Sequence, residues 1–297
     1  VAYYAIDESG QQSNRVPIAI SVGDVPSRNY SLSLNGGGPN DTGRVKIPVD
    51  FPGYDTAGPA IDVGQADFTI EFWLSGSQDA NQQAHDECLP NAWIYGNIVL
   101  DRDRYGQGRA WGLSVLNNKI TFGVSDEDGE AFSLCGSTDV LDERWHHIAV
   151  TRDYRSGEIN IFVDGVQDAS ARGPRGDISY PDDGMPADYC DGPCFRSDPF
   201  LVIGAEKHDA GPKWMGFTGL LDELRISTGI RYGRSFKVPG LPLRTDESTV
   251  ALLHFDEGSG IAILDDADPE NRRAIGFVSS GGQPAGPTWT EFSATKP

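Results

Sequence analysis

Apolar and polar residues alternate in short segments along most of the chain. Residues 68–74 alternate, and so do residues 111–116, which the pair Asn117-Asn118 joins to residues 119–124. A period of two, in segments rich in β-branched and aromatic residues and bounded by Gly, Asn, Asp and Pro, is typical of β-strands. Because an Asn pair suits a tight turn, residues 111–124 are predicted to form a hairpin.

The same alternation predicts a second hairpin and several later strands. Residues 146–151 and 158–163 flank a polar turn, and further strands are expected at residues 200–203, 220–226 and 249–255. Helical periodicity is almost absent. Many short strands at this spacing predict an antiparallel β-sandwich or barrel.

The first 25 residues differ from the rest and form a strand, a turn and a strand. Residues 3–10 follow the pattern Tyr-x-Ala-x-Asp-x-Ser-Gly, which resembles the last hairpin of a fibronectin type III domain. Two strands do not make a stable domain. Residues 1–25 are therefore expected to be the C-terminal hairpin of such a domain or to dock on the main body, residues 26–297.

Charge and composition narrow the partners. The chain has 44 acidic and 24 basic residues, a formal net charge of −20. A field of this sign argues against nucleic acid as a partner, and no apolar run approaches the length needed to cross a bilayer. The acidic excess fits uptake of divalent cations, but a charge that only maintains solubility is the simpler explanation.

The four cysteines indicate two disulfides in an oxidising compartment, and so a secreted or cell-surface protein. No Cys-x-x-Cys pair is present, and no His lies at zinc-finger spacing. Three connectivities are possible; Cys190 and Cys194 enclose only Asp-Gly-Pro, which favours a local loop and leaves Cys88 to pair with Cys135. Two polar segments, residues 75–93 and 167–199, have the character of insertions between strands.

Five motifs occur in order between residues 31 and 226. They lie at residues 31–48, 67–73, 144–150, 159–165 and 217–226, and the third and fourth, Arg-Trp-His-His-Ile-Ala-Val and Ile-x-Ile-Phe-Val-Asp-Gly, are the most recognisable. Together they resemble the bacterial laminin G-like domains of the concanavalin A-like lectin/glucanase superfamily. The resemblance implies an all-β fold, an antiparallel jelly-roll sandwich.

One departure from the family pattern concerns the first strand. Family members begin with a strand of the type Leu-Leu-His-Phe-Asp-Glu-Gly-Ser-Gly, which here occupies residues 252–260, after the closing strand. The segment is either a truncated second copy or the result of a circular permutation. We favour permutation, with residues 246–297 supplying the first strand, because a half-repeat would expose apolar residues and an open sheet edge.

The resemblance also implies a structural Ca²⁺ ion on the convex face. A hard cation of this kind takes six to eight oxygen ligands. The ligands implied are the carboxylate of Asp222 on the closing strand, carbonyl groups around Asn35 and Gly36, and further oxygens from Glu71 or Asp256. Alternatively, Asp222 only caps a turn or pairs with Arg225.

Hydrolases on this scaffold carry carboxylates at alternate positions of one strand, where they act as acid and nucleophile. The predicted strands lack that pair, and residues 101–104, Asp-Arg-Asp-Arg, are better explained as an ion-paired edge strand or turn. A catalytic role is therefore not expected, although a carbohydrate-active enzyme, a polysaccharide hydrolase or lyase, is the main alternative.

Glycan recognition needs flat aromatic rings beside fixed polar groups. Residues of both kinds in predicted loops and insertions form the candidate ligand-binding set: Trp93, Tyr95, Asp103, Arg104, Tyr105, Tyr180, Tyr189, His208 and Trp214. We expect a non-catalytic recognition module of a secreted or surface multidomain protein. Its partner would be a polysaccharide, a glycoconjugate or an extracellular protein. A calcium-stabilised adhesin or spacer repeat is a further alternative.

Overall fold

The structure is a computed structural model. It describes residues 29–36, 44–50, 59–83, 85, 87–104, 107–181, 199–208, 213–260, 262–268 and 287–294, with the short strands β1 (Ala2–Tyr3), β2 (Val16–Pro17), β17 (Ile275–Gly276), β18 (Ser279–Ser280) and β19 (Gln283–Pro284).

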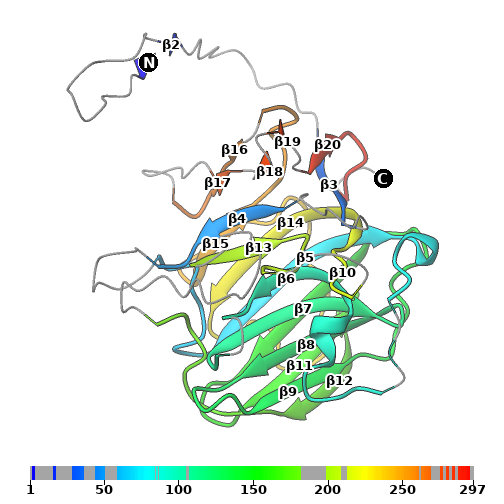
Figure 1. The fold of residues 1–297 in the computed structure, drawn as a ribbon, viewed down its shortest axis with the longest axis vertical. Helices are drawn as coiled ribbons and strands as arrows, with labels where there is room; N and C mark the ends of the chain where they lie inside the picture. Colours follow the sequence, from blue (N-terminus) through cyan, green and yellow to red (C-terminus); the bar gives the residue numbers. More distant parts are fainter. Residues whose placement is uncertain are drawn as a thin grey trace.

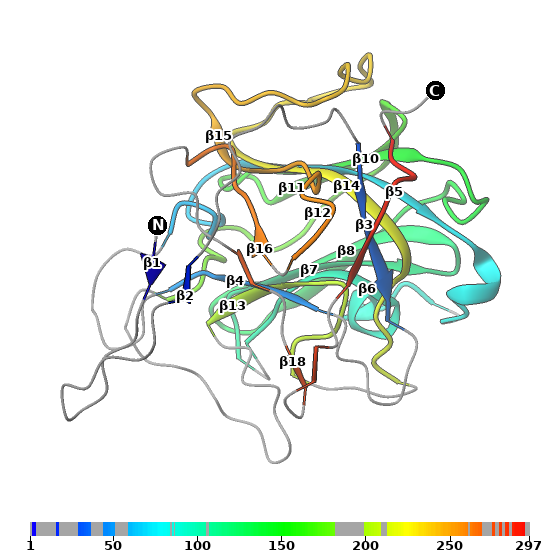
Figure 2. The same cartoon turned by 90° about the horizontal axis from the view of Figure 1, so that it is seen from above.

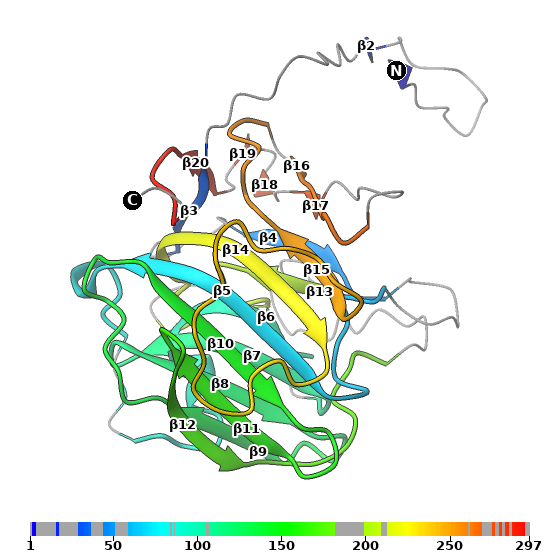
Figure 3. The ribbon, with the colours of Figure 1, turned by 180° about the vertical axis from the view of Figure 1, so that it is seen from behind.

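Two antiparallel sheets stacked face to face form the body of the molecule, as Figures 1 and 3 show from opposite sides. The larger sheet has eight strands. In order across the sheet they are β12 (Val166–Arg172), β11 (Glu158–Val163), β10 (His146–Arg152), β5 (Phe68–Gly76), β14 (Thr218–Thr228), β3 (Ser31–Asn35) and β20 (Thr288–Thr290), with β15 (Thr249–Leu253) also on β14.

The second sheet has six strands and lies against the first, which is clearest from above (Figure 2). Its strands are, in order, β4 (Val45–Pro48), β13 (Phe200–Ile203), β6 (Asn97–Arg102), β7 (Ala110–Leu116), β8 (Lys119–Ser125) and β9 (Ala131–Cys135). The sandwich predicted from the alternating pattern is confirmed. Apolar side chains of both sheets form one buried core between them, among them Phe72, Trp111, Phe122 and Leu221.

Both predicted hairpins are present. In the first, Leu116 of β7 pairs with Lys119 of β8, and Asn117 and Asn118 between them have φ angles of 51° and 66°. These are left-handed values, which Asn tolerates better than most residues, as a two-residue hairpin turn requires. In the second, β10 pairs with β11.

One edge of β14 is shared by two strands that come from opposite ends of the chain. β3 pairs with the first part of β14, where Leu32 lies opposite Leu221, and β15 pairs with the last part, where Leu253 lies opposite Leu224. A bulge between Asp222 and Arg225 separates the two pairings. The segment around residue 252 is therefore built into the main sheet beside β3.

Several strands of the two sheets were not predicted, among them β9, β12 and β20. β12 falls within the segment taken as an insertion at residues 167–199, but it pairs regularly with β11. It is an exposed edge strand without the usual apolar alternation, which is why the pattern missed it. β6 contains Asp101 and Arg102, and the expectation of an edge strand or turn there was wrong, since β6 lies between β13 and β7.

Residues 1–25 contribute the antiparallel pair β1–β2, and the rest of that segment lies outside the described residues. The helices in the described ranges are two short 3-10 turns, η1 (Gln78–Ala80) and η2 (Ala92–Tyr95). No helix in the described ranges is long and apolar enough to cross a membrane.

Candidate functional site

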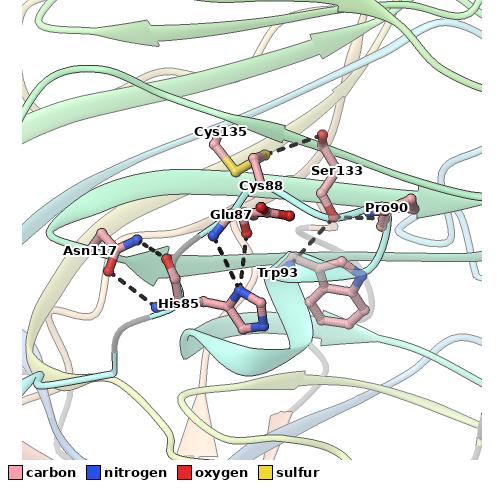
Figure 4. Close-up of a disulfide and its surroundings, with 8 residues drawn as sticks. All are labelled: His85, Glu87, Cys88, Pro90, Trp93, Asn117, Ser133 and Cys135. Atoms are coloured by element: carbon pink, nitrogen blue, oxygen red, sulfur yellow. Dashed lines mark hydrogen bonds between the residues drawn. A yellow bond between two sulfur atoms is a disulfide. The ribbon is translucent and has the colours of Figure 1, made fainter.

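The predicted insertion at residues 75–93 lies against the six-stranded sheet and is held there by a disulfide (Figure 4). Cys88 bonds to Cys135 at the end of β9, as predicted. Asn117, in the turn of the β7–β8 hairpin, receives a hydrogen bond from the backbone N–H of His85 and donates one to its carbonyl oxygen. The insertion is thus attached to the sheet on both sides of residue 87.

Trp93 fixes the end of the insertion. Its side chain is buried, and its ring lies where a Cβ atom at Gly112 of β7 or Gly123 of β8 would stand. Its backbone N–H donates to the hydroxyl of Ser133 at 3.4 Å. The sequence placed Trp93 in the ligand-binding set, but the residue packs inside the protein. The two glycines have no side chains, and this leaves room for the indole ring to lie flat on the sheet.

Three aromatic rings stack close to the end of η2, next to Trp93. The ring of Tyr95, at the end of η2, lies 5.5 Å from that of Trp214 and 5.5 Å from that of His85, with interplanar angles of 22° and 29°. All three side chains are partly exposed. We call His85, Tyr95 and Trp214 the aromatic stack. Two of the three were in the predicted set, and His85 was not.

A polar pocket of about 340 Å³ lies beside the stack and was not predicted. Its lining consists of amide side chains and one carboxyl group: Gln78, Asp79, Asn81, Gln82, Gln83, Asn117 and Asn118. We call it the amide pocket. Asn117 connects it to the aromatic stack through its hydrogen bonds with His85. Amides in a polar insertion were the signal for this pocket in the sequence, but they carry no spacing that distinguishes a site from a solvated loop.

Asn81 lines the amide pocket and is held in place by hydrogen bonds. Its side-chain amide donates to the carbonyl oxygens of Ser77 and Thr218, and its oxygen accepts from the N–H of Thr218 at 2.9 Å. By contrast, the side chains of Gln78, Gln82 and Asn118 make no hydrogen bond to any other residue in the described part of the chain. The amide pocket therefore combines one amide side chain that is fixed by the protein, that of Asn81, with three amide side chains that can bond to a ligand.

A second group of predicted residues meets at the opposite end of β6. Six residues of β6 separate the two ends, which corresponds to roughly 20 Å of strand. Asp103 and Arg104 follow β6, and His208 follows β13, where its Nδ1 lies 3.7 Å from Oδ2 of Asp103. The guanidinium of Arg104 lies 5.2 Å from the ring centre of Tyr180. The structure thus brings together Asp103, Arg104, Tyr180 and His208.

The sequence missed Glu206, which belongs to the same group. Its carboxylate lies 3.9 Å from Nδ1 of His208, and oxygens of Asp103 and Glu206 and a ring nitrogen of His208 lie within 4.8 Å of one another. The repeated spacing of two residues, Asp101 with Asp103 at the end of β6 and Glu206 with His208 after β13, was the signal available in the sequence.

Asp101 holds the two segments of this group together. Its carboxylate accepts the backbone N–H of Asp103 at 2.7 Å and that of Lys207 at 2.8 Å. Burial, together with the nearby carboxylates of Glu206 and Asp103, raises the pKa of Asp101 to about 8. Burial likewise raises the pKa of Asp103. These buried carboxyl groups therefore hold their protons more tightly than exposed ones do.

The expected calcium ligands divide between separate places. Asp222 is buried in β14 and accepts the N–H of Ala294 at 2.8 Å; burial, with Glu223 and Asp256 nearby, raises its pKa to about 8. Asp256 accepts the N–H of Tyr30. These two carboxylates lie in one region of the sheet edge shared by β3 and β15.

The other three ligands are elsewhere. Asn35 pairs with Thr218, four residues from Asp222 along β14, or roughly 13 Å, and the carbonyl of Gly36 accepts the N–H of Gly216. Glu71 faces Arg225 of β14, whose guanidinium donates to it at 2.6 and 2.8 Å. The five oxygen donors named from the sequence are not gathered into one coordination sphere, so they do not fit a single calcium ion.

Of the remaining predicted residues, Tyr105, Tyr189, Cys190 and Cys194 lie outside the described residues. The predicted pairing of Cys190 with Cys194 and the ligand-binding roles of the two tyrosines stay predictions.

Comparison with known families places the chain beside a described family. Residues 52–231, more than half of the chain, match the family model described as the concanavalin A-like lectin/glucanases superfamily. Comparison with curated proteins gives no match.

Several solved structures are similar to this chain at low sequence identity. One, from Bacteroides ovatus and described as carbohydrate-binding, has 16% identity and a TM-score of 0.46, covering 80% of this chain and 55% of its own length. Domains LG4-5 of the mouse laminin alpha1 chain have 16% identity and a TM-score of 0.42, covering 71% and 46%. The SAP-like pentraxin of Limulus polyphemus has 11% identity and a TM-score of 0.39, covering 67% and 76%. The chain thus spans about half the length of the first two.

Proposed function

Because the chain belongs to the concanavalin A-like lectin/glucanases superfamily, we propose that it is a non-catalytic module that binds glycans. The binding surface is the amide pocket together with the aromatic stack. The observation that carries this proposal is that an amide-lined pocket lies beside three stacked, partly exposed rings, next to the disulfide-anchored insertion.

The chemistry of this surface suits sugar hydroxyl groups. Each Gln or Asn side chain offers hydrogen-bond donors and an acceptor, and each sugar hydroxyl can likewise both donate and accept a hydrogen bond. The side chains of Gln78, Gln82 and Asn118 line the pocket, and none of them spends its hydrogen bonds on another described residue. A neutral, hydroxyl-rich ligand can satisfy them without the cost of burying a charge.

The aromatic stack supplies the apolar part of the recognition. The C–H face of a sugar ring packs on a flat aromatic ring while the hydroxyls at its edge reach polar partners. The rings of Tyr95 and Trp214 are partly exposed and nearly parallel. Asn117 brings the amide pocket next to them through His85, so one ligand could contact both.

The same pocket argues for binding without catalysis. Hydrolysis of a glycosidic bond uses two carboxyl groups in most enzymes. Among the residues that line the amide pocket, only Asp79 carries one. A carbohydrate-active enzyme would need its second carboxyl group from elsewhere, so recognition is the better-supported function.

We place this module in a secreted or surface multidomain protein. The Cys88–Cys135 disulfide fits an oxidising compartment. In this proposal residues 1–25 are the end of a fibronectin type III-like domain, and the partner is a polysaccharide or glycoconjugate rather than a nucleic acid.

A glycan microarray probed with the full chain, combined with a reducing-end assay on the glycans bound, tests the proposal. We expect binding that releases no new reducing ends, and weaker binding by Gln82→Ala, which removes an exposed amide at the pocket. Release of reducing ends would establish an enzyme, and absence of binding to all neutral glycans would contradict the proposal.

A further inference from the structure

We propose that Asp103, Glu206 and His208 bind one divalent cation of the zinc type. The site is independent of the proposed glycan surface, since it lies at the other end of β6. It joins the segment that follows β6 to the segment that follows β13.

The geometry of the three side chains is that of ligands around a common centre. Nδ1 of His208 lies 3.7 Å from Oδ2 of Asp103 and 3.9 Å from Oε1 of Glu206. These separations are too long for hydrogen bonds. Two ligands of one tetrahedral ion with bonds of about 2.0–2.1 Å lie about 3.3 Å apart, so the two distances to His208 would shorten by about half an ångström when an ion binds. The oxygens of Asp103 and Glu206, which lie within 4.8 Å of each other, would also have to approach.

Backbone hydrogen bonds orient the carboxylates toward His208. Oδ1 of Asp103 accepts the N–H of Arg104 at 2.6 Å, and Oε2 of Glu206 accepts the N–H of His208 at 2.7 Å. In each carboxylate the second oxygen is the one that lies nearest to the imidazole. One oxygen therefore fixes the side chain, and the other is directed at the proposed ion.

A second layer of contacts holds the ligand segments in place. The carboxylate of Asp101 binds the backbone N–H groups of Asp103 and Lys207, and Nζ of Lys207 donates to the carbonyl oxygen of Asp103 at 2.6 Å. Arg44 donates to the carbonyl oxygens of Glu206 and Lys207. Contacts of this kind orient ligands and tune metal affinity.

The donor set selects the kind of ion. Calcium prefers six to eight oxygen ligands, whereas imidazole with carboxylates suits zinc and related ions. The side chains of His208, Glu206 and Asp103 are 1%, 2% and 15% exposed, so all three are largely enclosed by the protein. A bound dication would neutralise the negative charges of the two carboxylates there. Three protein ligands leave a fourth position for water.

Calorimetric titration of the chelator-treated full chain with Zn²⁺, and separately with Ca²⁺, tests the site. We expect one equivalent of Zn²⁺ to bind and to raise the Tm, with Ca²⁺ binding at least tenfold more weakly. In a long-range ¹H–¹⁵N spectrum, Zn²⁺ should shift the signals of one of the five histidines.

Variants identify the ligands. His208→Gln and Asp103→Asn should each weaken Zn²⁺ binding by more than 100-fold, since loss of an outer-layer partner alone costs about 10–100-fold. His254→Gln is the matched control, because His254 also contacts two carboxylates, those of Glu223 and Asp266, and it should bind Zn²⁺ normally.

Normal affinity in a folded His208→Gln or Asp103→Asn variant would overturn the site. If neither variant folds, the wild-type spectrum decides: unchanged signals from every histidine at one equivalent of Zn²⁺ would overturn the site, and so would tighter binding of Ca²⁺ than of Zn²⁺.

Discussion

The α-carbon of Gly112 lies directly against the indole ring of Trp93, so that a Cβ atom at residue 112 would stand 1.9 Å from Cζ3 of the ring. Gly123 on the neighbouring strand leaves similar room, with a corresponding distance of 1.8 Å to Cδ1. These two glycines let Trp93 lie flat on the sheet. Because Tyr95 follows two residues later in η2, the same contact positions the aromatic stack.

We therefore expect Gly112→Ala to displace Trp93 and with it η2. Overpacking of this kind costs about 1–3 kcal/mol of unfolding free energy, and the proposed glycan affinity should fall as well. Urea unfolding measures the first effect. Gly233→Ala is the control, since a Cβ there meets no atom within 4 Å. Equal stability of the two variants would show that the sheet accommodates a Cβ atom beneath Trp93 and that this contact does not position the aromatic stack.

The disulfide should stabilise both the fold and the insertion. Cys88 and Cys135 are 47 residues apart, and replacing both by Ser should lower the unfolding free energy by about 2–4 kcal/mol. Hydrogen exchange of residues 87–96 should accelerate more than that of β10, which lies in the other sheet. Uniform acceleration of both regions would mean that the disulfide does not hold the insertion specifically.

A buried ion pair between Glu71 and Arg225 links β5 to β14. The carboxylate of Glu71 also accepts hydrogen bonds from Nε2 of His147 and from the hydroxyl of Tyr232 at 2.8 Å. Glu71→Gln leaves the guanidinium buried without its counter-charge, and we expect a loss of about 3–5 kcal/mol in unfolding free energy. Glu127→Gln, on an exposed turn, should change the stability by less than about 0.5 kcal/mol.

The same carboxylate contributes to acid sensitivity. Burial opposes ionisation of Glu71, but the hydrogen bond from His147 and the charge of Arg225 outweigh it and hold the pKa of Glu71 below 4.5. Its contribution is present above pH 4.5 and is lost as the pH falls through the lowered pKa of the folded state. The difference in stability between wild type and Glu71→Gln should therefore shrink below pH 4.5, and a constant difference would contradict this assignment.

His146 should make stability depend on pH in the opposite sense. Hydrogen bonds to Asp164 at 2.8 Å and to Asp142 at 2.9 Å outweigh burial and raise the pKa of His146 above 6.5. The charged form stabilises the fold below pH 6.5, and this contribution is lost as the pH rises through the raised pKa. His254, whose pKa is also raised, contributes a loss of the same sign. Between pH 5.5 and 8.5, urea unfolding should therefore show a loss of stability in the wild type that is about 1 kcal/mol larger than in His146→Gln.

The alternation of apolar residues was enough to predict the sandwich, because each strand buries one face in a common core. It correctly located strands such as β7, β8, β10 and β11, where that alternation is strong. It missed β12, whose side chains are mostly exposed, and it misjudged β6, where Asp101 and Arg102 are polar yet completely buried. Burial of charged groups depends on partners from distant segments, such as Lys207 for Asp101, which local pattern does not reveal.

The candidate sites were predictable only in part for a related reason. Loop aromatics were a useful guide to Tyr95 and Trp214, but the same criterion included Trp93, which two distant glycines allow to be buried. The single ligand-binding set expected from the sequence divides into two groups, because both ends of β6 carry residues of the predicted types. Only the pairing of β6 with β7 and β13 shows which residues share an end.

The most direct test of glycan binding at the aromatic stack is calorimetric titration of Trp214→Ala with the best glycan from the microarray. We expect its affinity to fall at least about fivefold, the equivalent of roughly 1 kcal/mol of stacking. Phe292→Ala, which removes an exposed aromatic ring outside the aromatic stack (55% exposed), should bind as the wild type does. Wild-type affinity in a folded Trp214→Ala variant would contradict the proposal that the aromatic stack binds the glycan.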